Sequence, residues 1–170
     1  MARKEDTPPG ILAVLAHGDN VSARVFVAAN PSTPAAALRH LYATDECAVV
    51  RERLARNKST PTDVLEKLVR DQDRQVQVAL AGNPSTPEAA LRRFAKSRLV
   101  YMRGNVAANK NLPSSVLTRL AGDDSVQVRF VVADNPSTPI AALARLTQDP
   151  DERVSDAAYR ALRRRKGRRP

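Results

Sequence analysis

The chain of 170 residues repeats itself about every 26 residues. The phrase Asn-Pro-Ser-Thr-Pro begins at Asn30, Asn83 and Asn135, and related phrases begin at Asn57 and Asn109. Repetition with a period of 20–50 residues is typical of stacked structural units, each of which buries its apolar face against its neighbours. We therefore expect about six stacked repeats, the first of them lacking the asparagine phrase. Such chains more often hold a partner than catalyse a reaction.

The first half of each repeat predicts a short helix. When the asparagine is counted as position 1, apolar residues recur at positions 8, 9, 12 and 13, a spacing that places them on one helical face. A Thr or Ser at position 4 is expected to cap this helix, and the proline at position 5 suits its first turn. Position 9 is leucine in every repeat: Leu12, Leu38, Leu65, Leu91, Leu117 and Leu143.

The second half of each repeat predicts another helix after an acidic or polar turn. Asp73, Ser125 and Asp151, at position 17, are candidate N-caps. Position 25 is alanine in every repeat except the last, where it is Tyr159, and a small residue there suggests that two helices approach closely. The next asparagine and proline end the helix, because a residue before proline avoids the helical conformation. No alternation typical of strands is present, so we predict an all-α fold.

The pattern NPSTPxxxLxxL, followed by an acidic turn and a segment ending in VAxN, resembles the variant leucine-rich repeat family and, more distantly, HEAT repeats. The resemblance covers about Thr7 to Leu162. It implies a right-handed superhelix in which an α-helix alternates with a short 3₁₀-helix, whereas the capping residues alone favour α for both. The family's founding member also holds an iron–sulfur centre in a cysteine cluster. This chain has only Cys47, so that cofactor is not carried over and no cofactor is expected.

These patterns together predict a right-handed α-solenoid of two-helix repeats over residues 4–162 and a basic tail over residues 163–170. A single cysteine excludes an internal disulfide and a cysteine-only metal site. No apolar run is long enough to cross a membrane and the first residues do not resemble a signal peptide, so the expected location is the cytoplasm.

The net charge of +10 is concentrated near the C-terminus. A basic block of this kind suits polyphosphate binding, and it equally suits a solvated chain end that keeps the protein soluble; the sequence leaves both interpretations open. The block consists of Arg160, Arg163, Arg164, Arg165, Lys166, Arg168 and Arg169.

Two columns of basic residues recur along the repeats. Position 11 carries His40, Lys67, Arg93, Arg119 and Arg145, and position 14 adds Arg70 and Lys96 on the same exposed face. This column could bind an anionic partner, but the favoured interpretation is an ordinary polar helix exterior.

The second column lies six residues before each asparagine and reads Arg24, Arg51, Gln77, Arg103 and Arg129. Acidic turns offer partners for it, so we predict a structural Arg–Asp ladder between repeats, formed with Asp71, Asp73, Asp123, Asp149 or Asp151.

Two repeats depart from the pattern. The fourth has no acidic turn, and its residues Arg98, Leu99 and Tyr101 form a candidate contact patch, although ordinary repeat degeneration is the favoured explanation. The second carries one extra residue near Thr44–Cys47, which is expected to bulge its turn.

No catalytic motif is present. His17 and His40 lack metal-ligand spacing, and the chain has neither a Gly-rich phosphate loop nor a nucleophile motif. A helical-repeat DNA glycosylase is the remote enzymatic alternative, but such enzymes handle a flipped base with aromatic residues, Trp among them, and this chain has no Trp. We therefore predict a non-catalytic scaffold without a metal or a membrane partner. It is expected to be a protein–protein adaptor or, as the alternative, to bind the nucleic-acid phosphate backbone through the basic column and tail.

Overall fold

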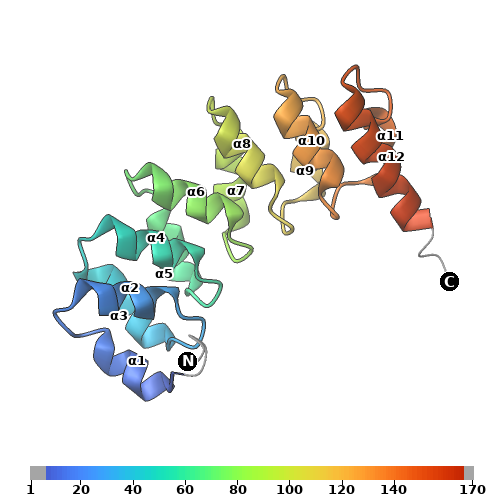
Figure 1. The fold of residues 1–170 in the computed structure, drawn as a ribbon. Helices are drawn as coiled ribbons and strands as arrows, with labels where there is room; N and C mark the ends of the chain where they lie inside the picture. The colour runs from blue at the N-terminus through green and yellow to red at the C-terminus, as the bar shows by residue number, and fades with distance from the viewer. Residues whose placement is uncertain (1–6, 167–170) are drawn as a thin grey trace. The chain divides into compact units, whose positions relative to one another are not determined.

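The computed structural model describes residues 7–166, and every regular element in that range is an α-helix (Figure 1). Each repeat contributes two helices, and the second is α in all of them, as the capping residues favoured, rather than the 3₁₀-helix that the resemblance implied. The helices are α1 (Pro9–Leu15), α2 (Val21–Ala29), α3 (Ala35–Thr44), α4 (Ala48–Arg56), α5 (Thr62–Leu68), α6 (Arg74–Gly82), α7 (Glu88–Phe94), α8 (Val100–Ala107), α9 (Ser114–Leu120), α10 (Val126–Asp134), α11 (Ile140–Leu146) and α12 (Glu152–Lys166).

The chain divides into two compact units, an N-terminal unit that ends at Pro87 and a C-terminal unit that begins at Glu88. In the N-terminal unit, α4 packs between α2 and α6. In the C-terminal unit, α10 likewise packs between α8 and α12. The first helix of each repeat packs against the second, so each unit is built of two helical layers of the helical-repeat solenoid class.

The predicted apolar positions form the core. All six position-9 leucines are at most 1% exposed. The position-25 alanines are fully buried where neighbouring second helices meet, which confirms the close approach that their small size suggested. Ile11 at position 8 and Tyr159 at position 25 are exposed, because no further repeat of the described chain covers them.

In three repeats the asparagine at position 1 bonds across the boundary between the two repeats that precede it. Asn57 is buried, and its Nδ2 atom donates to the carbonyl oxygens of Ala28 and Asn30, both at 2.9 Å. Its Oδ1 atom accepts the backbone N–H of Ser59 at 2.9 Å. Asn83 and Asn135 make the same three bonds. Because unpaired carbonyls at a buried helix end are costly, this amide is a structural requirement of the stack.

The prediction that the threonine at position 4 caps the following helix is wrong. The Oγ1 atom of Thr60 donates to the carbonyl of Leu54, in the last turn of the preceding helix, at 2.6 Å. Pro61 is itself the N-cap residue of α5, in an extended conformation and without a side-chain bond. Thr33, Thr86 and Thr138 bond backward in the same way. A short hydroxyl side chain can satisfy either helix end, and here the buried carbonyl of the preceding helix is within its reach.

The position-17 caps are confirmed in part. Asp73 accepts the backbone N–H groups of Gln75 and Val76, and Asp151 accepts that of Arg153. Ser125 occupies the N-cap of α10 but makes no capping bond.

The extra residue of the second repeat lengthens a helix and does not bulge the turn, contrary to expectation. Helix α3 has 10 residues and runs to Thr44, whereas α5 and α9 have seven. The acidic residue of the turn is thereby shifted by one position, to Asp45.

Candidate binding surface

Four ion pairs confirm the predicted Arg–Asp ladder. They join Arg24 to Asp45, Arg51 to Asp71, Arg103 to Asp123 and Arg129 to Asp149, at 2.6 or 2.7 Å between nitrogen and oxygen. In each pair the carboxylate belongs to the turn of the repeat that follows the arginine. Sequence reasoning missed Asp45 because the extra residue of the second repeat shifts it by one position. Asp73 and Asp151 were also candidate partners of the ladder arginines, but they cap helices and do not pair with these arginines.

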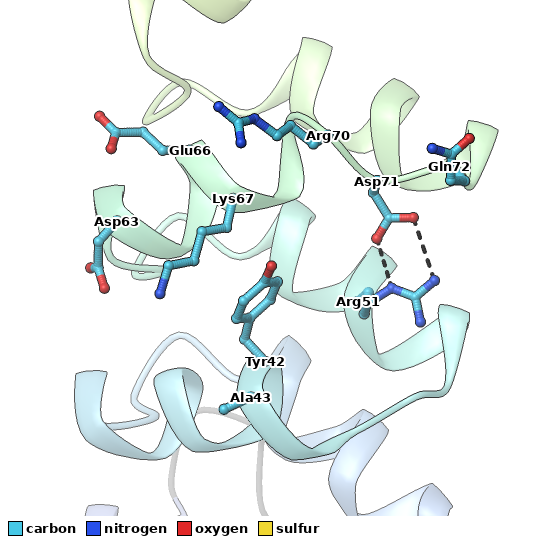
Figure 2. A pocket seen from close by; sticks show the side chains of 9 residues that line it. All are labelled: Tyr42, Ala43, Arg51, Asp63, Glu66, Lys67, Arg70, Asp71 and Gln72. Atoms are coloured by element: carbon cyan, nitrogen blue, oxygen red, sulfur yellow. Dashed lines mark hydrogen bonds and ion pairs between the residues drawn. The ribbon is translucent and has the colours of Figure 1, made fainter.

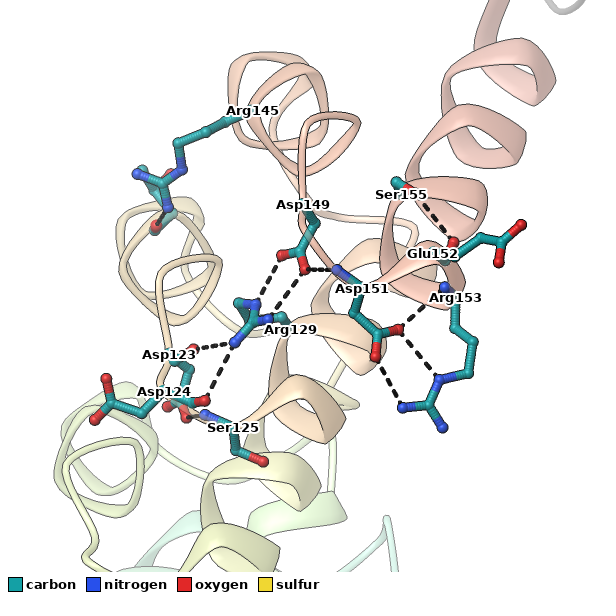
Figure 3. A network of polar contacts seen from close by, with 11 residues as sticks. Asp123, Asp124, Ser125, Arg129, Arg145, Asp149, Asp151, Glu152, Arg153 and Ser155 are labelled. Atoms are coloured by element: carbon teal, nitrogen blue, oxygen red, sulfur yellow. Dashed lines mark hydrogen bonds and ion pairs between the residues drawn. The ribbon is translucent and has the colours of Figure 1, made fainter.

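Each arginine of the ladder donates from at least two guanidinium nitrogens within the fold. Arg129 donates Nε to Asp149 at 2.7 Å and Nη2 to the same carboxylate at 3.0 Å, and its Nη1 donates to the carbonyl of Asp123 at 2.9 Å (Figure 3). Asp149 also accepts the N–H of Asp151. A largely buried guanidinium whose three nitrogens all donate within the fold is poorly available to a partner, so this column has a structural role.

The Asp149 pair predicts a loss of stability in acid. The hydrogen bond from Arg129 holds the pKa of Asp149 below its ordinary value, although burial acts in the opposite direction. Because the unfolded carboxyl has a pKa of about 3.9, the pair stabilises the fold above about pH 4, and this contribution is lost as the pH falls through the lower folded-state pKa. Urea unfolding at a series of pH values should show this decline. Both Asp149→Asn and Arg129→Gln should flatten it, and an unchanged slope in both variants would contradict the assignment.

In the N-terminal unit, the candidate basic residues lie among other ionisable groups. The ring of His40 stacks on that of His17 with 3.7 Å between centroids. Lys67 Nζ lies 5.7 Å from the ring centroid of Tyr42. Lys67, Tyr42 and Arg70 border a surface hollow of about 860 Å³ (Figure 2). Figure 2 shows that carboxylates also border this hollow, Asp63 and Glu66 among them, so its charge is mixed.

In the C-terminal unit, the basic residues at position 11 of the repeat have two different roles. Arg119 Nη2 donates to the carbonyl of Ala95 at 2.9 Å, and Arg145 Nη2 donates to that of Thr118 at 3.3 Å. Both arginines therefore bond to carbonyls of the preceding repeat, near the end of its first helix, where such groups lack helical partners. Arg93, at the same position, and Lys96 are exposed, and their side chains bond to no residue in the described range.

The part of the predicted basic tail that the structure describes, residues 163–166, belongs to a helix. Helix α12 continues to Lys166, and Arg164 pairs with Asp134 at 3.2 Å. Arg165 donates to the carbonyls of Thr138 and Pro136. Arg160 and Arg163 are exposed and bond to no residue that the structure describes. The side chain of Lys166, and Arg168 and Arg169, lie outside the described residues.

The candidate patch of the fourth repeat lies at the start of α8. Leu99 and Tyr101 are 41% and 39% exposed, and Val100 between them is 37% exposed. Arg98 before them is exposed as well. The patch borders a hollow of about 340 Å³ between α8 and α10. The principal lining residues are Val100, Tyr101, Gly104, Ala108, Val128 and Val131. The sequence offered one signal for this hollow, a glycine at position 104 where the next repeat has Phe130.

Residues 89–122 of the C-terminal unit contain seven basic residues and no acidic one. Sequence reasoning overlooked this stretch because acidic residues elsewhere in the repeats make the net charge of the repeats small. Four of its basic side chains are exposed and bond to no described residue: Arg93, Lys96, Arg98 and Lys110. The stretch therefore gives this part of the surface a positive charge that the fold does not neutralise.

Within residues 7–166, no helix combines the length and apolar character that a membrane span requires. The described side chains also include no group of three His, Cys, Asp or Glu placed to hold a metal ion. Cys47 is half-buried and occupies the N-cap of α4 without a side-chain bond.

A family model described as "Leucine rich repeat variant" matches residues 126–151. The solved structure of a leucine-rich repeat variant with a novel repetitive structural motif is 29% identical, with a TM-score of 0.61, and the match covers 93% of this chain. This chain spans 65% of the length of that structure. No curated protein matches.

A second solved structure, that of YibA from Escherichia coli, has a TM-score of 0.60 at 16% identity, and the match covers 96% of this chain and 72% of that one. At this identity the similarity concerns the fold alone. The predicted resemblance is thus confirmed: residues 126–151 match the leucine-rich repeat variant family, and nearly the whole chain resembles a solved leucine-rich repeat variant.

Proposed function

We propose that this chain is a non-catalytic scaffold that binds an acidic surface of a protein partner through its C-terminal unit. The acid-free stretch of residues 89–122 is the observation that carries the proposal. Arg93, Lys96, Arg98 and Lys110 expose charges there that no described residue neutralises. Unpaired cations of this kind steer an acidic partner and discriminate against a basic one.

The polar residues that recur along the repeats bond within the fold and are poorly available to a partner. The amides of Asn57 and Asn135 and the hydroxyls of Thr60 and Thr138 bond to backbone carbonyls. The ladder arginines are paired with aspartates. Binding specificity therefore comes from residues that differ between repeats, and the fourth repeat departs furthest from the pattern.

A protein partner suits this surface better than a nucleic acid. Leu99, Val100 and Tyr101 expose apolar surface and directly follow Arg98 in the chain. Protein interfaces combine an apolar centre with a polar rim, whereas phosphate contacts use positive charge and have no need of exposed aliphatic side chains. Nucleic-acid binding remains the second candidate, favoured by the exposed Arg160 and Arg163 that precede Arg168 and Arg169.

Titration of labelled probes separates the two candidates. The probes are a 20-residue peptide of glutamate, serine and leucine and a 20-base-pair DNA duplex, each measured by fluorescence anisotropy at several salt concentrations. The triple variant Arg93→Gln, Lys96→Gln and Arg98→Gln should weaken peptide binding by about tenfold or more. The control variant Arg160→Gln and Arg163→Gln should change it by less than about twofold.

Three outcomes would contradict the proposal. The first is no measurable peptide binding at low salt, and the second is peptide binding that the triple variant leaves unchanged. The third is duplex binding that is tighter than peptide binding, falls steeply with salt and is lost in the Arg160 and Arg163 variant, which would establish the second candidate.

A further inference from the structure

The hollow between α8 and α10 is lined by Gly104, which has no side chain to fill it. Gly104 occupies position 22 of its repeat, and position 22 of the next repeat holds Phe130. A Cβ atom built on Gly104 would meet no heavy atom within 4 Å. A glycine inside a helix costs about 1 kcal/mol relative to alanine, yet nothing at this site crowds a larger residue out. The glycine is therefore not explained by the packing of the chain itself.

The walls of the hollow are mostly apolar. Helix α8 contributes Val100 and Tyr101, its C-cap residue Ala108 adds a third group, and α10 contributes Val128 and Val131. Two amides, Asn105 and Gln127, supply the polar groups. Asn105 Nδ2 donates to the carbonyl of Tyr101 at 2.8 Å, which holds that amide in place. Apolar walls with a few fixed polar groups are the usual composition of a binding pocket, and about 340 Å³ is near the lower end of the usual size range.

Exposed cations precede and follow α8, the helix that forms one wall of the hollow. Arg98 lies two residues before α8 and Lys110 lies three residues after it, and the helix between them is eight residues, or about 12 Å, long. Two nearby carboxylates are already paired, Asp123 with Arg103 and Asp134 with Arg164. Asp124, at the turn before α10, adds one exposed acidic group. The net charge of these groups remains positive.

We propose that this hollow receives one apolar side chain, of the size of leucine or phenylalanine, from a protein segment whose neighbouring residues are acidic. The segment's acidic residues lie near Arg98 and Lys110, and Leu99 and Tyr101 cover the inserted side chain. This arrangement places a buried apolar anchor at the centre of the contact and charges at its rim. The proposal deepens the proposed function, because it names the part of the C-terminal unit that contacts the partner and the chemistry of the segment it contacts.

A pair of labelled peptides tests the anchor. Both have 12 residues of glutamate and serine, and they differ only in a central leucine or serine. We expect the leucine peptide to bind about tenfold more tightly or better, because burial of one such side chain is sufficient for that difference. Gly104→Phe should fill the hollow and abolish the difference. Gly82→Phe is the matched control, because Gly82 is also helical and open around its Cβ position, and it should leave the difference unchanged. Equal binding of the two peptides to the unmodified chain would overturn the proposal.

A neutral probe tests the hollow independently of charge. In a ¹⁵N-labelled chain, N-acetyl-leucine amide at millimolar concentration should shift the amide signals of Gly104, Ala108 and Val131, and Gly104→Phe should prevent these shifts. If neither peptide binds but these shifts occur, the hollow is an apolar site and the proposed acidic partner is wrong. If no shift occurs at these residues, the hollow is not a binding site, whatever the peptides show.

Discussion

Replacing Asn57 by aspartate is expected to lower the free energy of unfolding by about 3–5 kcal/mol, the usual cost of a buried charge without a partner. Asn57 is 5% exposed. Its Nδ2 atom donates to two carbonyl oxygens at 2.9 Å, those of Ala28 near the end of the first repeat and of Asn30 at the start of the second. An aspartate has the same shape and still accepts the N–H of Ser59, but it would direct a negative oxygen at the two carbonyls instead of donating to them.

Asn57→Ala should cost less, about 2–3 kcal/mol, because it leaves the two carbonyls unpaired without adding a charge. The matched control is Asn20→Asp, the same chemical change at the exposed N-cap of α2. Asn20 only accepts there, from the N–H of Ala23, so an aspartate keeps the bond and suits the positive end of the helix. We expect the control to change stability by less than about 0.5 kcal/mol. Urea unfolding, monitored by circular dichroism, measures the free energy of unfolding of all three variants. A loss below about 1 kcal/mol for Asn57→Asp would show that this amide does not join the repeats.

The elements that the sequence predicted well are those whose cause lies within one repeat or recurs in all of them. The leucines of position 9 are buried because their spacing places them on one helical face. The ladder was predictable because an arginine and an acidic turn recur with the same period. These patterns determine which residues face inward, whatever the details of the contacts between repeats.

The sequence could not predict features that depend on distances between repeats. The threonine of a Thr-Pro pair can cap the helix that follows or bond to the helix that precedes it. Thr60 bonds to the preceding helix because the carbonyl of Leu54 lies within reach of its hydroxyl, and the sequence does not contain that distance. Arg93 and Arg119 share a position in the repeat, yet only Arg119 reaches a carbonyl in the described part of the chain. The hollow at Gly104 likewise arises from the spacing between α8 and α10, which no pattern within one repeat encodes.

Replacing Leu91 by alanine should lower the free energy of unfolding by about 2–5 kcal/mol, because the change removes buried apolar surface and leaves a cavity that the fold closes only in part. Leu91 is 1% exposed in α7 and represents the position that is leucine in every repeat. Ile140→Ala is the matched control in the same unit, since Ile140 in α11 is 59% exposed and its loss opens no cavity. The control should cost less than about 0.5 kcal/mol in the same urea titration. A loss of that small size for Leu91→Ala would mean that position 9 does not form the core on which the stacked repeats depend.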